Sequence, residues 1–143
     1  MITAFNGAYT RLSNYALCSV WFEDHMYPSV EHAYQAAKTR DPALRRAIRN
    51  AVTPNVSKKM GRSVPLRDDW ESVKIPVMRE LLWQKFAQEP EKLVLLSTGE
   101  EELVEGNWWG DTFWGQCPLG NGQNHLGKLL MEIRAELRHV HQT

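Results

Sequence analysis

A polar stripe runs along one predicted helix, in the segment SVEHAYQAAKT. Glu31, Gln35 and Lys38 stand at positions i, i+4 and i+7, so they share one face of that helix. A carboxylate and an amine on one wall of a pocket are groups that acid–base or nucleophilic catalysis uses. The same spacing is also typical of a solvated helix face. Spacing alone leaves both interpretations open.

The segment GNWWGDTFWG, residues 106–115, is the second candidate. Asp111 stands among Trp108, Trp109 and Trp114, and the glycines around it allow the backbone to approach a ligand. Three tryptophans within seven residues of a loop are a common means of stacking a base. The alternative is a turn aspartate that caps its own backbone beside aromatic core residues. The residues do not decide between the two.

Two further segments carry weaker signals. SKKMGR contributes Lys58 and Arg62, and the loop LGNGQN, which includes Asn124, precedes the last predicted helix. Glycine-rich helix starts attract anions. However, neither segment matches a phosphate-binding GxxxxGK[ST] loop or a dinucleotide-binding GxGxxG motif. Basic residues on a helix are usually just solvated.

Several classes of protein are excluded. The five histidines and two cysteines show no metal-ligand spacing, so we expect no metal site, and there is no GxSxG nucleophile elbow. Cys18 and Cys117 suggest free thiols in a reducing compartment. The N-terminal residues lack a secretory pattern, and no apolar run approaches the ~20 residues of a membrane span. We therefore expect a soluble, cytoplasmic protein without membrane association.

The length of 143 residues favours one domain, residues 1–143, of the α+β class and mostly α-helical. Cap residues and apolar periodicity predict six helices, with Pro76 as a kink or break in the fourth. They cover about 29–39, a stretch that opens at Asp41-Pro42, 53–61, 67–88, 90–99, and a last stretch that begins near Gln123. Short β runs are expected near ITAF and SVWFE, with turns at Asn6-Gly7 and Glu23-Asp24. A further short strand followed by a loop is expected within 101–121.

Four segments, in this order, resemble the YbiA-like (NADAR) family. They are FNGAYTRLSNY, YPSVEHAYQAAK, MGRSVPLRDDWESVKIPVMRELLWQKF, and WWGDTFWG followed by GQNHLGKLLMEIR. The resemblance runs from about Phe5 to Arg138 and implies the YbiA-like fold and N-glycosidase activity. The functional positions that it implies here are Glu31, Trp70, Asp111 and either Trp108 or Trp109, with Lys38 on the stripe of Glu31 and Asn14 facing the pocket.

Members of this family are associated with two kinds of substrate. One is the ribosylamino-pyrimidine phosphate intermediates of riboflavin synthesis, and the other is ADP-ribose on the amino group of guanine. Both contain ribose C1 bonded to an exocyclic amine. We favour removal of ADP-ribose from guanine, with ADP-ribosylated single-stranded DNA or RNA as substrate and an ADP-ribosyltransferase toxin as functional counterpart. The alternatives are a riboflavin-intermediate N-glycosidase and a catalytically silent module that binds ADP-ribose.

Charge limits the nucleic-acid hypothesis. Seventeen basic residues balance seventeen acidic ones, so the chain as a whole has no electrostatic footprint for a long duplex. A single flipped or unpaired base stays within reach of a local pocket.

Two mechanisms fit the shared linkage. An uncharged Lys38 could attack C1 of the opened ribose and form a Schiff base that water hydrolyses. Direct hydrolysis by Glu31 and Asp111 is the simpler route, with either carboxylate in either role. Hydrolysis of this bond needs neither a metal nor an organic cofactor, so we expect none.

Overall fold

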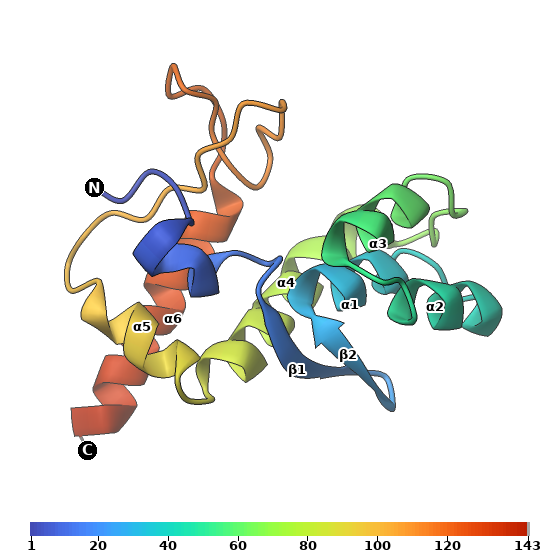
Figure 1. Ribbon diagram of the computed structural model, residues 1–143, viewed down its shortest axis with the longest axis horizontal. Helices are drawn as coiled ribbons and strands as arrows, with labels where there is room; N and C mark the ends of the chain where they lie inside the picture. Colours follow the sequence, from blue (N-terminus) through green and yellow to red (C-terminus); the bar gives the residue numbers. More distant parts are fainter. Residues whose placement is uncertain (143) are drawn as a thin grey trace. The chain divides into compact units, whose positions relative to one another are not determined.

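The computed structural model describes residues 1–142 and divides into two compact units. The central unit is Asn14–Lys85, and the terminal unit joins Met1–Ser13 to the chain from Phe86 onward. Figure 1 traces both along the chain. The fold class is as predicted, since the elements are mostly helices, with one two-stranded sheet among the described residues.

The central unit begins with an antiparallel hairpin of β1 (Leu17–Phe22) and β2 (His25–Ser29). Glu23 and Asp24, the predicted turn residues, both have positive φ, at 43° and 73°. Two successive positive φ values are what a tight two-residue hairpin loop requires. Val20 and Tyr27 face each other across the strands and are buried, while Trp21 and Met26, also paired, are exposed.

Three short helices follow the hairpin: α1 (Val30–Ala37), α2 (Pro42–Arg49) and α3 (Pro54–Gly61). Each begins where its cap predicts. The Ser29 hydroxyl accepts a hydrogen bond from the His32 amide, the Asp41 carboxylate from those of Ala43 and Leu44, and the Thr53 hydroxyl from that of Val56. Both α2 and α3 have proline at the first helical position. α1 packs against α2, α3 and both strands, so it forms the core of this unit.

The fourth helix, α4 (Trp70–Phe86), differs from its prediction at its start. It begins at Trp70, three residues after the predicted start. In the turn before it, the Arg67 amide donates to the Lys38 carbonyl and the Arg67 guanidinium donates to the Asp69 carboxylate. Pro76 lies inside the helix, so of the two predicted outcomes, a kink or a break, the break does not occur. A proline removes one backbone hydrogen bond, and the remaining bonds of this 17-residue helix keep it continuous.

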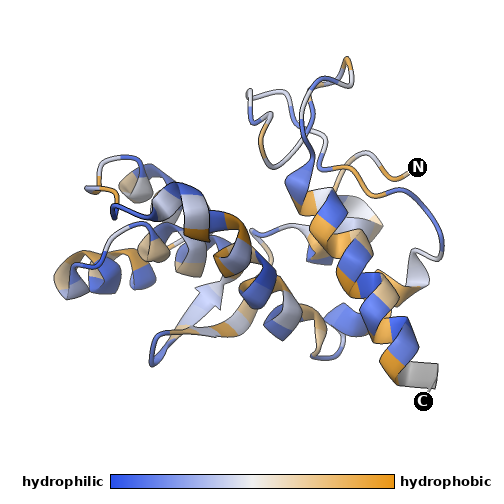
Figure 2. Ribbon diagram, turned by 180° about the vertical axis from the view of Figure 1, so that it is seen from behind, coloured by the Kyte–Doolittle hydropathy of each residue, from blue (hydrophilic) through white to orange (hydrophobic). Residues whose placement is uncertain are grey.

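The terminal unit contains η1 (Gly7–Leu12), a 3-10 helix, together with α5 (Glu91–Ser97) and α6 (His125–Gln142). α5 packs against η1 and α6. The predicted apolar face of α6 is buried at Leu126, Leu130, Ile133 and Leu137, and Figure 2 shows it as orange bands along the helix. α6 begins after Asn124, whose φ of 51° ends the preceding loop.

Two predicted strands were wrong. Near ITAF and within 101–121 the described chain forms only single-residue bridges, Ile2 to Leu103 and Gly106 to Gln116. The Ile2 amide donates to Glu102 and the Ile2 carbonyl accepts from Val104, and the chain then turns into η1. No described helix has the length and apolarity that crossing a membrane requires.

Candidate active site

The polar stripe of α1 is buried. Glu31 is 7% exposed and Gln35 is 3% exposed, and every residue from Val30 to Ala37 is buried. Gln35 donates from Nε2 to Glu31 Oε1 over 2.8 Å. The interpretation of this stripe as a solvated helix face is therefore wrong. A buried carboxylate needs compensating partners, and the Gln35 amide is one of them.

Gly61, the last residue of α3, makes room for the Gln35 amide. A Cβ at Gly61 would lie 2.8 Å from Gln35 Cδ and closer still to Oε1. The close approach of α3 to α1 at this point therefore depends on the missing side chain.

Two buried acceptors in the central unit have no hydrogen-bond partner among the described residues, Asn14 Oδ1 and Gln35 Oε1. Asn14 is 6% exposed, its Nδ2 donates to Met78 Sδ at 3.6 Å, and its carbonyl accepts from the Glu31 amide. A buried acceptor without a donor costs about 1–3 kcal/mol. Such groups therefore favour a ligand that carries donors.

Lys38 is half-buried at the C-terminal end of α1. Burial lowers the pKa of its ammonium below the usual value, while the charge of Glu31 opposes that shift. Three neighbouring cations lower the pKa of Lys38 further: Lys58, Arg62 and Lys74. Burial and like charges thus both favour an uncharged amine, the form that can act as nucleophile or base.

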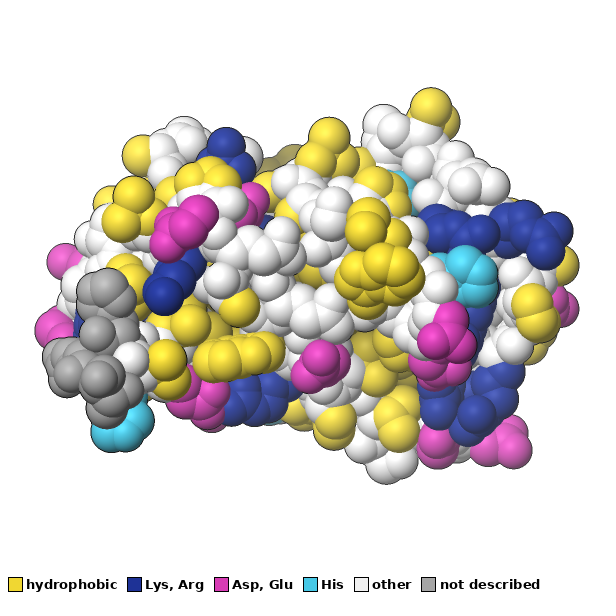
Figure 3. All heavy atoms as spheres, turned by 90° about the horizontal axis from the view of Figure 1, so that it is seen from below, with side chains coloured by type: hydrophobic (Ala, Val, Ile, Leu, Met, Phe, Trp, Pro, Cys, Tyr) yellow, Lys and Arg dark blue, Asp and Glu magenta, His cyan; other side chains and the backbone are white. Residues whose placement is uncertain are grey.

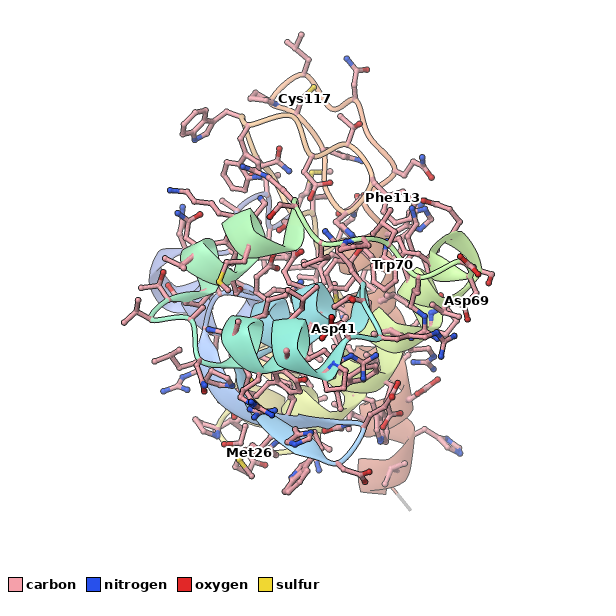
Figure 4. The ribbon with its side chains drawn as sticks, turned by 90° about the vertical axis from the view of Figure 1, so that its right-hand side faces the viewer. Met26, Asp41, Asp69, Trp70, Phe113 and Cys117 are labelled. Carbon is pink, nitrogen blue, oxygen red and sulfur yellow. The ribbon has the colours of Figure 1, made fainter. Side chains whose placement is uncertain are left out.

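Tyr34 connects Lys38 with Trp70. Lys38 Nζ lies 5.7 Å from the centroid of the Tyr34 ring, and the centroids of the Tyr34 and Trp70 rings are 5.2 Å apart. Trp70, labelled in Figure 4, is 5% exposed. Its packing contributes to the core as well as to any stacking role. Sequence reasoning missed Tyr34 and Lys74 as site residues, although each stands four residues from a selected one, Lys38 or Trp70.

Asp111 caps its own turn in the terminal unit. Its Oδ1 accepts from the amides of Phe113 at 3.2 Å and Trp114 at 2.9 Å. The buried Asn107 side chain brackets the same residue, accepting from the Asp111 amide and donating to its carbonyl. The capping interpretation is confirmed, and it leaves open a second role for the half-buried carboxylate.

The two adjacent tryptophans are not core residues. Trp108 is 83% exposed and Trp109 is 53% exposed, with their rings edge-on at 5.9 Å. Trp108, Asn107 and Gln116 line part of a cavity of about 490 Å³ within the terminal unit, beside Cys117, which Figure 4 labels on this loop. Exposed indole rings on a hydrogen-bonded turn are suited to stacking on a base.

Asn124, the remaining residue predicted to bind substrate, is buried. Its Oδ1 accepts from the Glu105 amide and its Nδ2 donates to the Leu103 carbonyl. Both side-chain groups thus hold the loop that precedes α6.

The predicted site residues fall into two groups. Asn14, Glu31, Gln35, Lys38, Lys58, Arg62 and Trp70 belong to the central unit, and Trp108, Trp109, Asp111 and Asn124 to the terminal unit. Within the central unit, Lys38 has Glu31, Lys58 and Arg62 in its electrostatic environment. Convergence of the two groups on one pocket stays a prediction. No group of three or more His, Cys, Asp and Glu side chains in the described part of the chain could hold a metal.

Comparisons with known proteins identify relatives along almost the whole chain. A family model described as the NADAR domain matches residues 4–138. The N-glycosidase YbiA of Escherichia coli (strain K12) is 42% identical over 132 residues, covering 90% of this chain and 82% of that protein. A riboflavin biosynthesis protein of Vibrio vulnificus is 36% identical over 130 residues, covering 89% of this chain and 35% of that protein.

The fold agrees with these similarities. The NMR structure of Escherichia coli YbiA matches with a TM-score of 0.85 at 39% identity, covering 99% of this chain and 87% of that one. The chain therefore belongs to the NADAR domain family and is a homologue of the N-glycosidase YbiA.

Proposed function

We propose that this protein is an N-glycosidase that hydrolyses the bond between ribose C1 and an exocyclic amine, and that it removes ADP-ribose from guanine bases of nucleic acid. The enzyme class, a hydrolase acting on N-glycosyl compounds, rests on its N-glycosidase homologues. The observation that carries the choice of site is the buried stripe of α1, where Glu31 and Gln35 are hydrogen-bonded and Lys38 is half-buried.

The lowered pKa of Lys38 supports a covalent route. In an N-glycoside of an exocyclic amine, the ribose ring can open to an imine at C1. The uncharged Lys38 amine adds to C1, the bond from C1 to the base nitrogen breaks, and the base departs as a free amine after taking up a proton. Water then adds to the C1–Lys38 imine, which releases the sugar and restores the amine.

Direct hydrolysis is the alternative chemistry at the same site. One carboxyl group protonates the departing nitrogen while a carboxylate faces the oxocarbenium-like sugar. Glu31 and Asp111 are the candidates for these two roles.

Recognition of the substrate is divided among the other residues. Lys58 and Arg62 supply positive charge for the pyrophosphate, and the free acceptor atoms of Asn14 and Gln35 suit ribose hydroxyls. Trp70, Trp108 and Trp109 supply aromatic faces for the base.

Riboflavin-pathway N-glycosides are the second candidate substrates, because a homologue is named a riboflavin biosynthesis protein. They share the ribose–amine linkage and also carry a phosphate. One experiment separates the two. The protein is incubated with an ADP-ribosyl-guanine oligonucleotide and, separately, with a ribosylamino-pyrimidine phosphate, and each is followed by mass.

We expect release of ADP-ribose and recovery of the unmodified oligonucleotide, with slower or no cleavage of the pyrimidine substrate. Faster cleavage of the pyrimidine would transfer the assignment to riboflavin intermediates. Binding of ADP-ribose without cleavage of either substrate would favour a silent binding module.

Borohydride reduction separates the covalent route from the direct one. A Schiff base on Lys38 predicts a sugar–protein adduct, trapped during turnover, and no activity for Lys38→Arg, whose guanidinium is not a usable nucleophile. An unmodified intact mass together with an active Lys38→Arg enzyme would establish direct hydrolysis instead.

A further inference from the structure

The neutral overall charge conceals two oppositely charged units. The central unit contains twelve lysines and arginines and eight aspartates and glutamates, a net charge of +4. The terminal unit contains five basic and nine acidic residues, a net charge of −4. Most of the asymmetry comes from one stretch. Residues 42–67 contain seven basic side chains and no acidic one.

The basic residues of this stretch repeat one spacing on two successive helices. Arg45, Arg46 and Arg49 of α2 stand at i, i+1 and i+4, and Lys58, Lys59 and Arg62 repeat that pattern at the end of α3. With 3.6 residues per turn, each triad falls within an arc of about 100°. Each helix therefore has one cationic side.

Three of the seven basic residues are engaged within the fold. One is Arg49, whose guanidinium lies over the Tyr27 ring, 5.9 Å from its centroid. Arg45 pairs with Glu23 at 3.1 Å and donates to the Thr39 carbonyl, and Arg67 pairs with Asp69 at 2.6 Å. Arg46, Lys59 and Arg62 are exposed instead. Figure 3 shows dark blue side chains gathered at the α2 end of the central unit.

We infer that the surface formed by the remaining cations of α2 and α3, Arg46, Lys58, Lys59 and Arg62, binds the sugar–phosphate backbone of a single-stranded nucleic acid. This surface is called the α2–α3 surface below. The inference rests on the proposed function and deepens it. The protein would recognise the strand around the modified base as well as the base itself.

Charge and chemistry both favour a single strand. Each helix is eight residues, or about 12 Å, long, enough for a few successive phosphates of one strand and far short of a duplex footprint. The guanine amino group is on the edge of the base that pairs in a duplex, so an enzyme that acts on it needs an unpaired or flipped base.

Fluorescence anisotropy with an unmodified, labelled single-stranded oligonucleotide tests this inference. An oligonucleotide without ADP-ribose keeps the test independent of whether the protein cleaves any N-glycosidic bond. The test variant is Arg46→Ala/Lys59→Ala, which removes two cations from the α2–α3 surface. The matched control is Lys92→Ala/Lys128→Ala, which removes two cations from the terminal unit.

We expect the test variant to bind on the order of tenfold more weakly at 50 mM salt, while the control binds as the unchanged protein does. The slope of log K against log salt concentration should also become less steep, by about 1.4 for two lost phosphate contacts of a single strand. Equal affinity of the test variant and the unchanged protein would overturn the inference. So would binding to phosphatidylserine vesicles but not to the oligonucleotide.

Discussion

Gln35 donates a hydrogen bond to Glu31 over 2.8 Å, one helical turn apart on a helix whose residues are all buried. The amide holds one carboxylate oxygen in place and leaves that carboxylate its charge. The opposite side of the amide faces Gly61, where a side chain would collide with it. The position of the Glu31 carboxylate thus depends on a glycine in a different helix.

The first prediction concerns Gly61. Alanine usually stabilises a helix relative to glycine by about 1 kcal/mol. Here we expect Gly61→Ala to displace the Gln35 amide, break its bond to Glu31 and lower kcat at least tenfold. Initial rates and thermal melting of this variant would be compared with those of Ser63→Ala, an exposed control two residues away. Full activity of Gly61→Ala would show that the Gln35–Glu31 contact has no part in catalysis.

The second prediction concerns pH. Because Lys38 must lose a proton to act as nucleophile, activity should rise as pH increases through the pKa of Lys38, which burial and nearby cations lower. Lys74→Gln removes one of those cations and should raise the pKa of Lys38. The rising part of the kcat/KM profile should then move to higher pH. If the pH profile of kcat/KM is unchanged in Lys74→Gln, its rising part reflects the titration of another group.

The third prediction concerns the exposed tryptophans. Since Trp108 is 83% exposed, Trp108→Ala should change the free energy of unfolding by less than about 0.5 kcal/mol. If its ring stacks on the base, the same variant should weaken substrate binding by about 1–3 kcal/mol. Trp109→Ala, measured beside it by calorimetry, shows which ring has this role. Unaltered binding in both variants would remove this pair from the site.

The fourth prediction separates two roles of Asp111. Asn at this position keeps an oxygen that can accept from the Phe113 and Trp114 amides but loses the negative charge. We expect Asp111→Asn to melt within a few degrees of the unchanged protein and to lose at least a hundredfold in kcat. Asp111→Ala, which removes the cap as well, should also lower the melting temperature. An active Asp111→Asn enzyme would limit this residue to capping its turn.

Much of the central unit could be predicted from local chemistry. Ser29, Asp41 and Thr53 mark the starts of three helices because their side chains bind the first free amides, an interaction within a few residues. The hairpin turn at Glu23 and Asp24 is equally local. The two wrongly predicted strands lie where the chain instead makes single bridges, one of which joins Ile2 to Leu103, about a hundred residues away along the chain. Contacts between such distant segments have no local signal.

Burial of the α1 stripe could not be predicted in the same way. A polar stripe at i, i+4 and i+7 is the pattern of a solvent-facing helix, and only the packing of α1 against two helices and the hairpin removes Glu31 from water. The environment of Lys38 likewise depends on cations from α3 and α4, up to 36 residues away along the chain. The resemblance of four ordered segments selected these residues, while spacing left them undecided.

The role of the α1 stripe in C–N cleavage is tested most directly by the kcat/KM of the Glu31→Gln variant. The substrate is the one that the unchanged protein cleaves faster, and mass spectrometry follows the release of its sugar. Glutamine keeps the size of Glu31 and removes the charge. We predict a loss of about 10²- to 10⁴-fold, the usual contribution of a positioned acid or base, in a variant that remains folded by circular dichroism. A Glu31→Gln enzyme that retains more than half of the original kcat/KM would contradict this assignment.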